Sequence, residues 1–335
     1  MTTHENYMQR CLQLAQNGLG TTYPNPLVGS VIVSDTADIL GEGWHRKAGE
    51  PHAEVNAVLD AEKKGCAESA FAKAVLYVNL EPCFHTGKTP PCASLIIKKG
   101  FKKVVIGTLD PHEKVAGKGI ALLKEAGIEV IVGVLEKQCN ELNKRFFTFH
   151  TKQRPYIILK WAETSDGFIA PVQKEEQKPV WITTPYSRQL SHRLRAQEQA
   201  ILVGAQTILD DDPSLTCREW QGINPTRVVL DSRNSLENKW NVFNEEASTI
   251  KLSSTNPQTI MEQLYNQNIQ SVIVEGGART IQSFIDVHLW DEAHQFMGTK
   301  ILFYKGLRAP KLKGNYIIKS RQSIKNDVLK IYKDL

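Results

Sequence analysis

Residues 80–92 read LEPCFHTGKTPPC, and this segment connects a predicted strand over residues 74–80 to a predicted helix over residues 92–99. It places Cys83 just after the strand and Cys92 at the first position of the helix. The same alternation of strand and helix continues on both sides of the segment. An α/β fold with a largely parallel sheet is therefore predicted here.

The periodicity of apolar residues predicts the other elements of the first half. It favours strands over residues 28–33, 103–109 and 130–134, and helices over residues 5–16, 52–63, 118–126 and 136–150. Residues 151–155 are polar and end in proline, which is typical of a domain boundary. We therefore expect two domains, residues 1–150 and residues 151–335.

The second half is also predicted to be α/β. Its patterns favour strands over residues 156–161, 200–204, 227–230 and 271–275, and helices over residues 185–197 and 278–289. Residues 171–179 read PVQKEEQKP and are expected to form a solvated loop.

Three residues of the first half suit a zinc ion. His52 opens a predicted helix, and together with Cys83 and Cys92 it supplies one imidazole and two thiolates. Three protein ligands leave the fourth position of zinc open for water, which is the arrangement of catalytic sites. Glu54 follows His52 by two residues and is predicted to carry the proton that the reaction moves.

The pattern His-x-Glu followed by Pro-Cys is the signature of zinc-dependent deaminases. This chain departs from the signature at one point, because eight residues rather than two separate its cysteines. The sequence leaves His45, His85 and His112 as alternative ligands, and His85 is also a candidate for a side chain that faces the substrate.

The second half carries a candidate site for phosphate groups. Residues 274–280 read VEGGART and place two glycines between a predicted strand and a predicted helix. Backbone N–H groups at the start of a helix bind phosphate, and glycine lets a ligand approach the backbone closely. Arg195 and Arg218 are candidates for a bidentate clamp on a phosphomonoester.

Composition excludes several classes of protein. The 335 residues carry a net charge of +5, with 41% hydrophobic and 23% charged residues, which excludes a disordered chain, a collagen-like fibre and a disulfide-rich mini-protein. The sequence has no run of 18 apolar residues and no secretory signal pattern, so no membrane partner is expected. Six dispersed cysteines favour a reducing cytoplasm. No nucleic-acid partner is expected, because no Lys/Arg run has interleaved aromatic residues.

Taken together, these segments resemble the bifunctional deaminase–reductase family of riboflavin biosynthesis. The likeness covers nearly the whole chain and rests on PNPLVG (24–29), AGEPHAEVNA (48–57), LEPCFHTGKTPPC (80–92), KWAETSDGFIA (160–170), WITTPYSRQLSHRLRAQ (181–197), AILVGAQTILDDDPSLTCR (200–218), VVLDSRN (228–234) and VEGGART (274–280). The resemblance implies a cytidine-deaminase-like three-layer α/β/α domain over residues 1–150. It also implies a dihydrofolate-reductase-like α/β domain over residues 151–335.

The resemblance further implies two successive reactions on one small-molecule pyrimidine ribotide. A zinc-dependent deaminase would hydrolyse an amino group from 2,5-diamino-6-ribosylamino-4-pyrimidinone 5′-phosphate. A reductase would then use NADPH to convert the ribosyl group to ribityl. A homo-oligomer in the cytoplasm is implied as well.

Site residues carry over by their positions in the matching segments. In the first half His52, Cys83 and Cys92 would hold zinc, Glu54 would shuttle the proton, and Asn25 would line the pyrimidine pocket. The positions for NADP are Ala162, Trp181, Thr207, Asp211, Ser232, Gly277, Ala278, Arg279, Thr280, Ile281, Gln282 and Ser283. The positions for the ribotide are Arg195, Leu215, Arg218 and Glu275. The acid of the reduction is either Asp211 or Lys160.

Two segments of the second half depart from the family pattern. Pro179 stands where a serine would contact the substrate, and proline has neither an N–H nor a hydroxyl group to donate. Residues 298–303 replace a motif similar to P-K-L-L-G. Both departures concern the ribotide contacts and leave the zinc residues untouched.

Two other hypotheses fit parts of the pattern. In the first, a zinc deaminase acts on a nucleic-acid base and the second half is a binding module, which would not need NADPH. In the second, the chain is an inactive scaffold stabilised by zinc. Glu54 argues against the scaffold, because a structural site needs no proton carrier and takes a fourth protein ligand.

Overall fold

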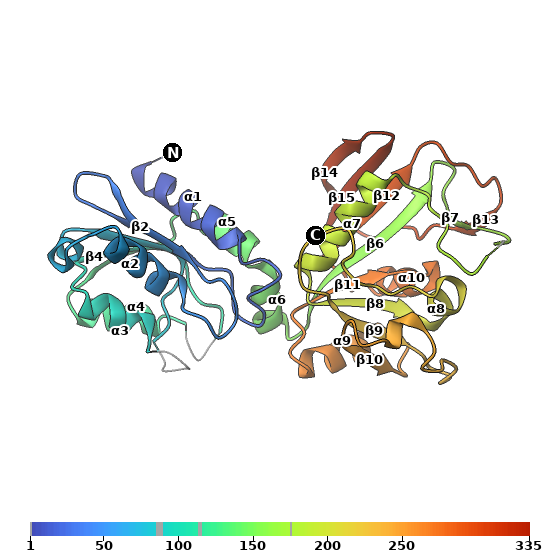
Figure 1. Ribbon diagram of the computed structural model, residues 1–335, viewed down its shortest axis with the longest axis horizontal. Helices are drawn as coiled ribbons and strands as arrows, with labels where there is room; N and C mark the ends of the chain where they lie inside the picture. The colour runs from blue at the N-terminus through green and yellow to red at the C-terminus, as the bar shows by residue number, and fades with distance from the viewer. Residues whose placement is uncertain (1, 85–89, 113–115, 175) are drawn as a thin grey trace. The chain divides into compact units, whose positions relative to one another are not determined.

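The computed structural model describes residues 2–84, 90–112, 116–174 and 176–335. The chain divides into two compact units, Met1–Lys152 and Gln153–Leu335 (Figure 1). The division falls within the polar segment at residues 151–155.

The first unit is built on a five-stranded sheet in the order β2-β1-β3-β4-β5. Its strands are β1 (Gly29–Val33), β2 (Ile39–Trp44), β3 (Val75–Leu80), β4 (Lys103–Thr108) and β5 (Glu129–Val132). The prediction of a largely parallel sheet holds for β3, β4 and β5 but is wrong for β1, which runs antiparallel to β2 and β3. The link between β1 and β2 is too short for the crossover that a parallel pair requires.

Strand β2 was not predicted from the sequence. Its residues, ILGEGW, contain two glycines that pack against the backbone of α2 (Ala53–Lys63). A Cβ atom at Gly41 would lie 2.2 Å from the Ala57 carbonyl oxygen, and one at Gly43 would lie 2.4 Å from the Ala57 nitrogen. The close approach of α2 and β2 therefore requires glycine at these two positions. Glycine is rare within strands, so it obscures the sequence pattern by which a strand is predicted.

Helices cover both faces of this sheet, as the three-layer prediction requires. They are α1 (Thr3–Gln16), α2, α3 (Cys92–Lys98), α4 (Lys118–Glu125), α5 (Glu136–Leu142) and α6 (Lys144–Lys152). Ile32 points into the apolar cluster that includes residues of α2, α3 and α4, whereas Val31 and Val33 point into the cluster that includes residues of α1 and α5. The helix predicted over residues 136–150 is two helices separated by Asn143, whose buried amide hydrogen-bonds the backbone of Leu27 in both directions.

The second unit is built on an eight-stranded sheet in the order β10-β9-β8-β11-β6-β12-β15-β14. Its strands are β6 (Tyr156–Thr164), β8 (Ala200–Gly204), β9 (Thr226–Leu230), β10 (Thr249–Leu252), β11 (Ser271–Glu275), β12 (Glu292–Gly298), β14 (Tyr316–Ile324) and β15 (Asp327–Asp334). The strands from β10 to β12 are parallel, and β15 and β14 complete the sheet as an antiparallel hairpin. A separate ribbon pairs β7 (Phe168–Pro171) with β13 (Gly306–Arg308).

Helices also cover both faces of the second sheet. Residues of α9 (Pro257–Asn266) and α10 (Ala278–Asp286) pack in one apolar cluster, and residues of α7 (Pro185–Gln197) and α8 (Ala205–Asp211) pack in another. Every strand predicted in this half is present, but the sequence did not reveal α8, α9 or the six strands β7, β10, β12, β13, β14 and β15. Strand β14 is almost entirely exposed, so its sequence lacks the alternation that marks a half-buried strand.

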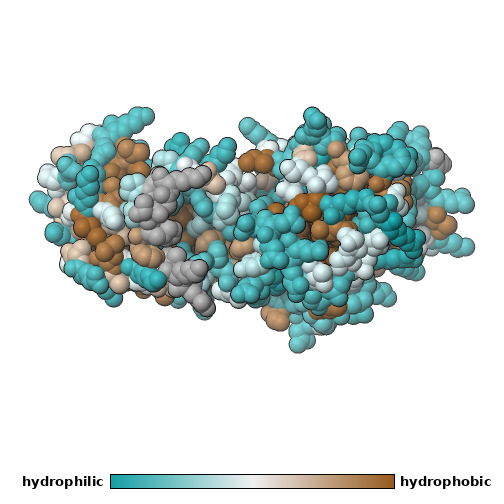
Figure 2. All heavy atoms as spheres, turned by 90° about the horizontal axis from the view of Figure 1, so that it is seen from below, coloured by the Kyte–Doolittle hydropathy of each residue, from teal (hydrophilic) through white to brown (hydrophobic). Residues whose placement is uncertain are grey.

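Within the described ranges, no helix is both long enough and apolar enough to cross a bilayer. On the face drawn in Figure 2, hydrophilic residues predominate and hydrophobic residues form small separate patches.

Candidate active sites

Three secondary-structure ends bring His52, Cys83 and Cys92 together in the first unit. His52 immediately precedes α2, Cys92 is the first residue of α3, and Cys83 follows β3. His52 Nδ1 lies 3.6 Å from Cys83 Sγ and 3.4 Å from Cys92 Sγ. A tetrahedral zinc ion with ordinary Zn–N and Zn–S bond lengths separates such nitrogen and sulfur atoms by roughly 3.6 Å. The chemistry and spacing of the donor set therefore fit zinc.

The two sulfur atoms are arranged to form a metal-binding thiolate. The backbone N–H of Cys92 donates to Cys83 Sγ at 3.3 Å. Hydrogen bonding from the Cys92 thiol, aided by His52, lowers the pKa of Cys83 below its ordinary value. This favours the thiolate of Cys83, and the thiolate is the form that binds metal ions.

Glu54 lies beside these ligands in the first turn of α2. Its side chain is only 3% exposed, and burial raises the pKa of its carboxyl group to about 7. A carboxyl group with this pKa can both accept and release a proton near neutral pH, which is what a proton carrier must do. The structure thus places Glu54 beside the three candidate ligands.

Asn25 contacts His45, which in turn packs against the candidate ligand His52. The Asn25 side-chain amide lies 3.0 Å from His45 Nε2, and the rings of His45 and His52 pack edge to face with centroids 5.2 Å apart. His45 Nδ1 faces the Pro51 carbonyl oxygen at 3.2 Å, so both ring nitrogens of His45 have partners. Burial lowers the pKa of His45, which favours its neutral form.

Of the alternative ligands predicted from sequence, His45 and His112 do not join the cluster. Among the described residues, His52, Cys83 and Cys92 form the single group of three that could hold a metal ion. The His112 ring packs against His150, with centroids 4.9 Å apart. His85 lies outside the described residues.

Sequence reasoning missed the role of Glu81, although it noted the Glu-Pro-Cys stretch. This side chain is 4% exposed and accepts hydrogen bonds from four backbone N–H groups, those of Asp110, Gly117, Gly119 and Ile120. It thereby caps α4, whose own N-cap residue is a glycine without a capping side chain. Glu81 thus anchors the chain two residues before Cys83.

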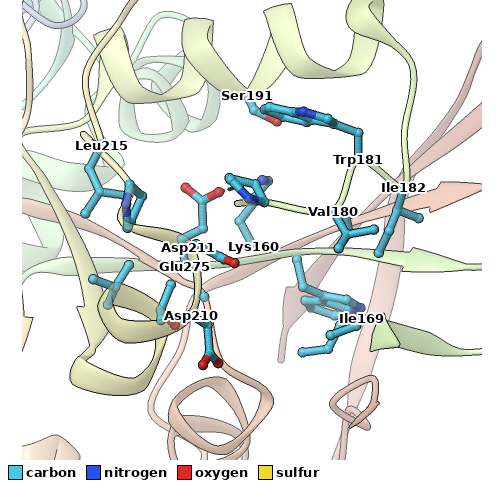
Figure 3. Close-up of a pocket in the computed structure, with 18 of the residues that line it drawn as sticks. Lys160, Ile169, Val180, Trp181, Ile182, Ser191, Asp210, Asp211, Leu215 and Glu275 are labelled. Carbon is cyan, nitrogen blue, oxygen red and sulfur yellow. Dashed lines mark hydrogen bonds and ion pairs between the residues drawn. The ribbon is translucent and has the colours of Figure 1, made fainter. Parts of the chain in front are cut away.

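The second unit contains a cavity of about 420 Å³ at the carboxyl ends of its parallel strands (Figure 3). Lys160 and Glu275 are paired on the neighbouring strands β6 and β11, and Lys160 Nζ lies 2.7 Å from Glu275 Oε1. Arg195 Nη2 from α7 lies 3.1 Å from Glu275 Oε2. Burial alone would raise the pKa of Glu275, but the charges of Arg195 and Lys160 lower it to about 2.

Two arginines line the cavity, and one of them has a donor without a partner among the described residues. The Nε atom of Arg195 is buried and has no hydrogen-bond partner among the described residues. Arg218 lines the same cavity and donates to the Thr216 hydroxyl at 3.4 Å. Two arginines therefore face one space, as a clamp on an anion requires.

The cavity contains most of the predicted ligand positions, but not all of them. From the NADP set it is lined by Ala162, Trp181, Thr207, Asp211 and Gly277, and from the ribotide set by Arg195, Leu215, Arg218 and Glu275. The remaining positions do not line it; they are Ser232, which follows β9, and Ala278, Arg279, Thr280, Ile281, Gln282 and Ser283 of α10. The Ile281 side chain is fully buried in the core, so only its backbone is available to a ligand.

Asp211, a candidate for the acid, and Pro179, a departure from the family pattern, both lie in the cavity wall. Asp211 lines the cavity and forms an ion pair with Lys174. Pro179 lines the cavity beside Val180 and Trp181. The departure noted in the sequence therefore lies in the wall of the site.

Comparison with known proteins identifies both halves. Residues 1–108 match the cytidine and deoxycytidylate deaminase zinc-binding region, and residues 155–311 match the RibD C-terminal domain. The riboflavin biosynthesis protein RibD of Aquifex aeolicus is 41% identical over 324 residues, covering 89% of this chain and 87% of that protein. The corresponding protein of Escherichia coli is 38% identical over 334 residues, covering 89% and 88%.

Solved structures agree with this comparison. A diaminohydroxyphosphoribosylaminopyrimidine deaminase/5-amino-6-(5-phosphoribosylamino)uracil reductase from Thermotoga maritima has a TM-score of 0.90 and 39% identity, over 99% of both chains. RibD of Acinetobacter baumannii has a TM-score of 0.87 and 31% identity, over 99% of this chain and 98% of that one. These matches extend across both units, and the chain therefore belongs to the RibD family of riboflavin biosynthesis proteins.

Proposed function

We propose that this protein is a bifunctional enzyme that acts twice on one pyrimidine ribotide. Residues 1–150 hydrolyse an amino group from 2,5-diamino-6-ribosylamino-4-pyrimidinone 5′-phosphate, and residues 151–335 reduce the ribosyl group of the product to ribityl with NADPH. The observation that carries this proposal is the triangle of His52, Cys83 and Cys92 beside the buried Glu54. The relative from Thermotoga maritima is named for both activities.

In the deaminase half, His52, Cys83 and Cys92 would hold zinc, which when bound would supply Lewis acidity. Glu54 takes up a proton from the attacking water at its carboxylate and passes it to the departing ammonia, a role supported by its burial and its pKa of about 7. Asn25, oriented by its contact with His45, hydrogen-bonds the pyrimidine.

In the reductase half, NADPH, when bound, supplies the reducing equivalent. The proposed cofactor positions are Ala162, Trp181, Thr207, Asp211, Ser232 and the run from Gly277 to Ser283 at the start of α10. Arg195 and Arg218 bind the ribotide phosphate, while Leu215 and Glu275 complete the ribotide wall. Lys160 and Asp211 are the two candidates for the proton donor, because both line the cavity; Lys160 is paired with Glu275 and Asp211 with Lys174.

The proposal includes the partners of the enzyme and its location in the cell. Its partners are a small-molecule ribotide and a second copy of the chain in a homo-oligomer. The cytoplasm is the proposed location, because a reducing compartment keeps Cys83 and Cys92 from oxidation and available as ligands, and all six cysteines are free in this structure.

A single assay tests both activities. Zinc-loaded protein is mixed with the diaminopyrimidine ribotide and NADPH, and ammonia release and NADPH oxidation are recorded together. We expect ammonia to appear first and NADPH oxidation to follow. Ammonia without NADPH oxidation or binding would favour a deaminase with a binding module, and no ammonia would contradict the proposed substrate.

Replacing Cys83 with serine is expected to abolish zinc binding and therefore deamination. Serine lacks the low-pKa thiolate that Cys83 provides. The measurement is zinc content per chain after dialysis, with Cys66→Ser as a control because Cys66 is a half-buried thiol outside the cluster. One zinc ion per chain in the Cys83 variant would eliminate Cys83 as a ligand.

A further inference from the structure

We propose that Asp327 is a positioning residue for the reductase cavity. It holds in place the part of the cavity wall that runs from Trp181 to Arg195. Asp327 lies at the start of β15, in the C-terminal hairpin, and does not line the cavity itself. The proposal rests on the reductase function proposed above. It gives a function to the hairpin of β14 and β15, two strands that were not predicted from the sequence.

The contact is made by one carboxylate oxygen of Asp327. Its Oδ2 atom accepts hydrogen bonds from the Thr184 backbone N–H at 2.7 Å, the Thr184 hydroxyl at 2.7 Å and the Ser187 hydroxyl at 2.6 Å. The side chain is 3% exposed, so water does not compete strongly for these bonds. Hydrogen bonds to a charged acceptor are about twice as strong as those between neutral groups.

These bonds cap α7 from outside the helix. Thr184 is the N-cap residue of α7, but its hydroxyl does not bond the helix's own N–H groups. The negative charge of Asp327 instead lies at the positive end of the helix dipole, where an anion is stabilised. The first residue of β15 therefore anchors the N-terminal end of α7.

The segment that Asp327 holds forms one wall of the cavity. On its N-terminal side, Trp181, Ile182 and Thr183 line the cavity, and within α7 so do Arg188, Ser191, His192 and Arg195. Trp181 is one of the proposed NADPH residues and Arg195 one of the proposed ribotide residues. A shift at the start of α7 would therefore displace contacts to both ligands.

Two further contacts tie the same segment to the C-terminal strands. A Cβ atom at Gly298, the last residue of β12, would lie 2.1 Å from the Ile182 carbonyl oxygen, so the backbone of the wall packs directly on that strand. The Lys325 amine, at the hairpin turn, lies 4.6 Å from the centre of the Tyr186 ring on α7. The wall thus has support from β12, from the hairpin turn and from Asp327.

The test compares Asp327→Asn with the wild type at a temperature at which both are folded. NADPH affinity is measured by the quenching of tryptophan fluorescence, and KM and kcat are measured for NADPH oxidation. We expect NADPH to bind about tenfold more weakly and kcat/KM to fall about tenfold, because the charge that orders the wall is removed. Ammonia release in the same sample is expected to stay within about twofold of the wild type, since Asp327 lies in the second unit.

Matched variants separate positioning from general stability. Glu237→Gln makes the same chemical change at an exposed carboxylate and is expected to leave all readouts unchanged. Ser187→Ala removes one of the three bonds and is expected to weaken NADPH binding less than Asp327→Asn does. Combined with Asp327→Asn it should add little, because Asp327→Asn already weakens the bond that Ser187→Ala removes.

Each outcome decides the proposal. Unchanged NADPH affinity and kcat/KM in Asp327→Asn, even with a lower unfolding temperature, would overturn it. Full additivity of the two changes would also overturn it. Failure of the proposed function is distinguishable, because then the wild-type protein itself would neither bind nor oxidise NADPH.

Discussion

Replacing Glu54 with glutamine is expected to reduce ammonia release by about 10³-fold while zinc stays bound, since general acid–base catalysis contributes on that order. Glutamine has nearly the same shape as glutamate but cannot take up and release a proton. The buried position of Glu54 in the first turn of α2 can accept the neutral amide, because the carboxyl group already has a pKa of about 7.

The measurement is ammonia release from the ribotide, together with the zinc content of the same sample. Glu62→Gln is the matched control, because Glu62 lies on the same helix but is exposed and paired with Lys99. Normal ammonia release from zinc-loaded Glu54→Gln would refute the proton-carrier role. Loss of zinc from that variant would instead show that Glu54 maintains the site.

Replacing Arg195 with alanine is expected to lower kcat/KM for the reduction by about 100-fold and to leave deamination unchanged. The change removes a guanidinium group that faces the cavity and contacts Glu275 at 3.1 Å. It also leaves the buried carboxylate of Glu275 with Lys160 as its remaining ion-pair partner among the described residues. A charge-assisted hydrogen bond is worth about 1.5–3 kcal/mol, and about 1.4 kcal/mol corresponds to a tenfold effect.

This prediction is tested through the ribotide KM in NADPH oxidation, with ammonia release as the internal reference. Arg193→Ala is the matched control, because Arg193 lies on the same helix, is exposed, and stacks on Trp220 rather than lining the cavity. An unchanged ribotide KM in Arg195→Ala would remove Arg195 from the phosphate site and confine it to an ion pair with Glu275.

The zinc-site candidates could be predicted from the sequence because they lie in short motifs at the ends of strongly patterned elements. His52 and Glu54 are two residues apart at the start of a helix and form the His-x-Glu part of the deaminase signature. Cys83 and Cys92 flank the segment between β3 and α3. The alternation of apolar runs also predicted the α/β class, because buried parallel strands read as continuous hydrophobic segments.

The same local reasoning could not determine how distant segments pair. Whether β1 runs parallel or antiparallel to β3 depends on the chain path, and β14 lacks a buried face to mark it. Nothing in the sequence around Asp327 indicates that it caps a helix. Its partner Ser187 on that helix lies 140 residues earlier in the chain.

The reductase cavity shows most clearly what the sequence could predict and what required the tertiary structure. The sequence alone identified Lys160, Arg195 and Glu275 as candidate residues and the first half as a zinc-dependent deaminase domain. Only the tertiary structure showed that these three side chains form one ion-paired group, because they come from β6, α7 and β11 and meet through the pairing of parallel strands. Local motifs follow from neighbours along the chain, whereas such a group depends on strand order and register, which arise from the packing of the whole core.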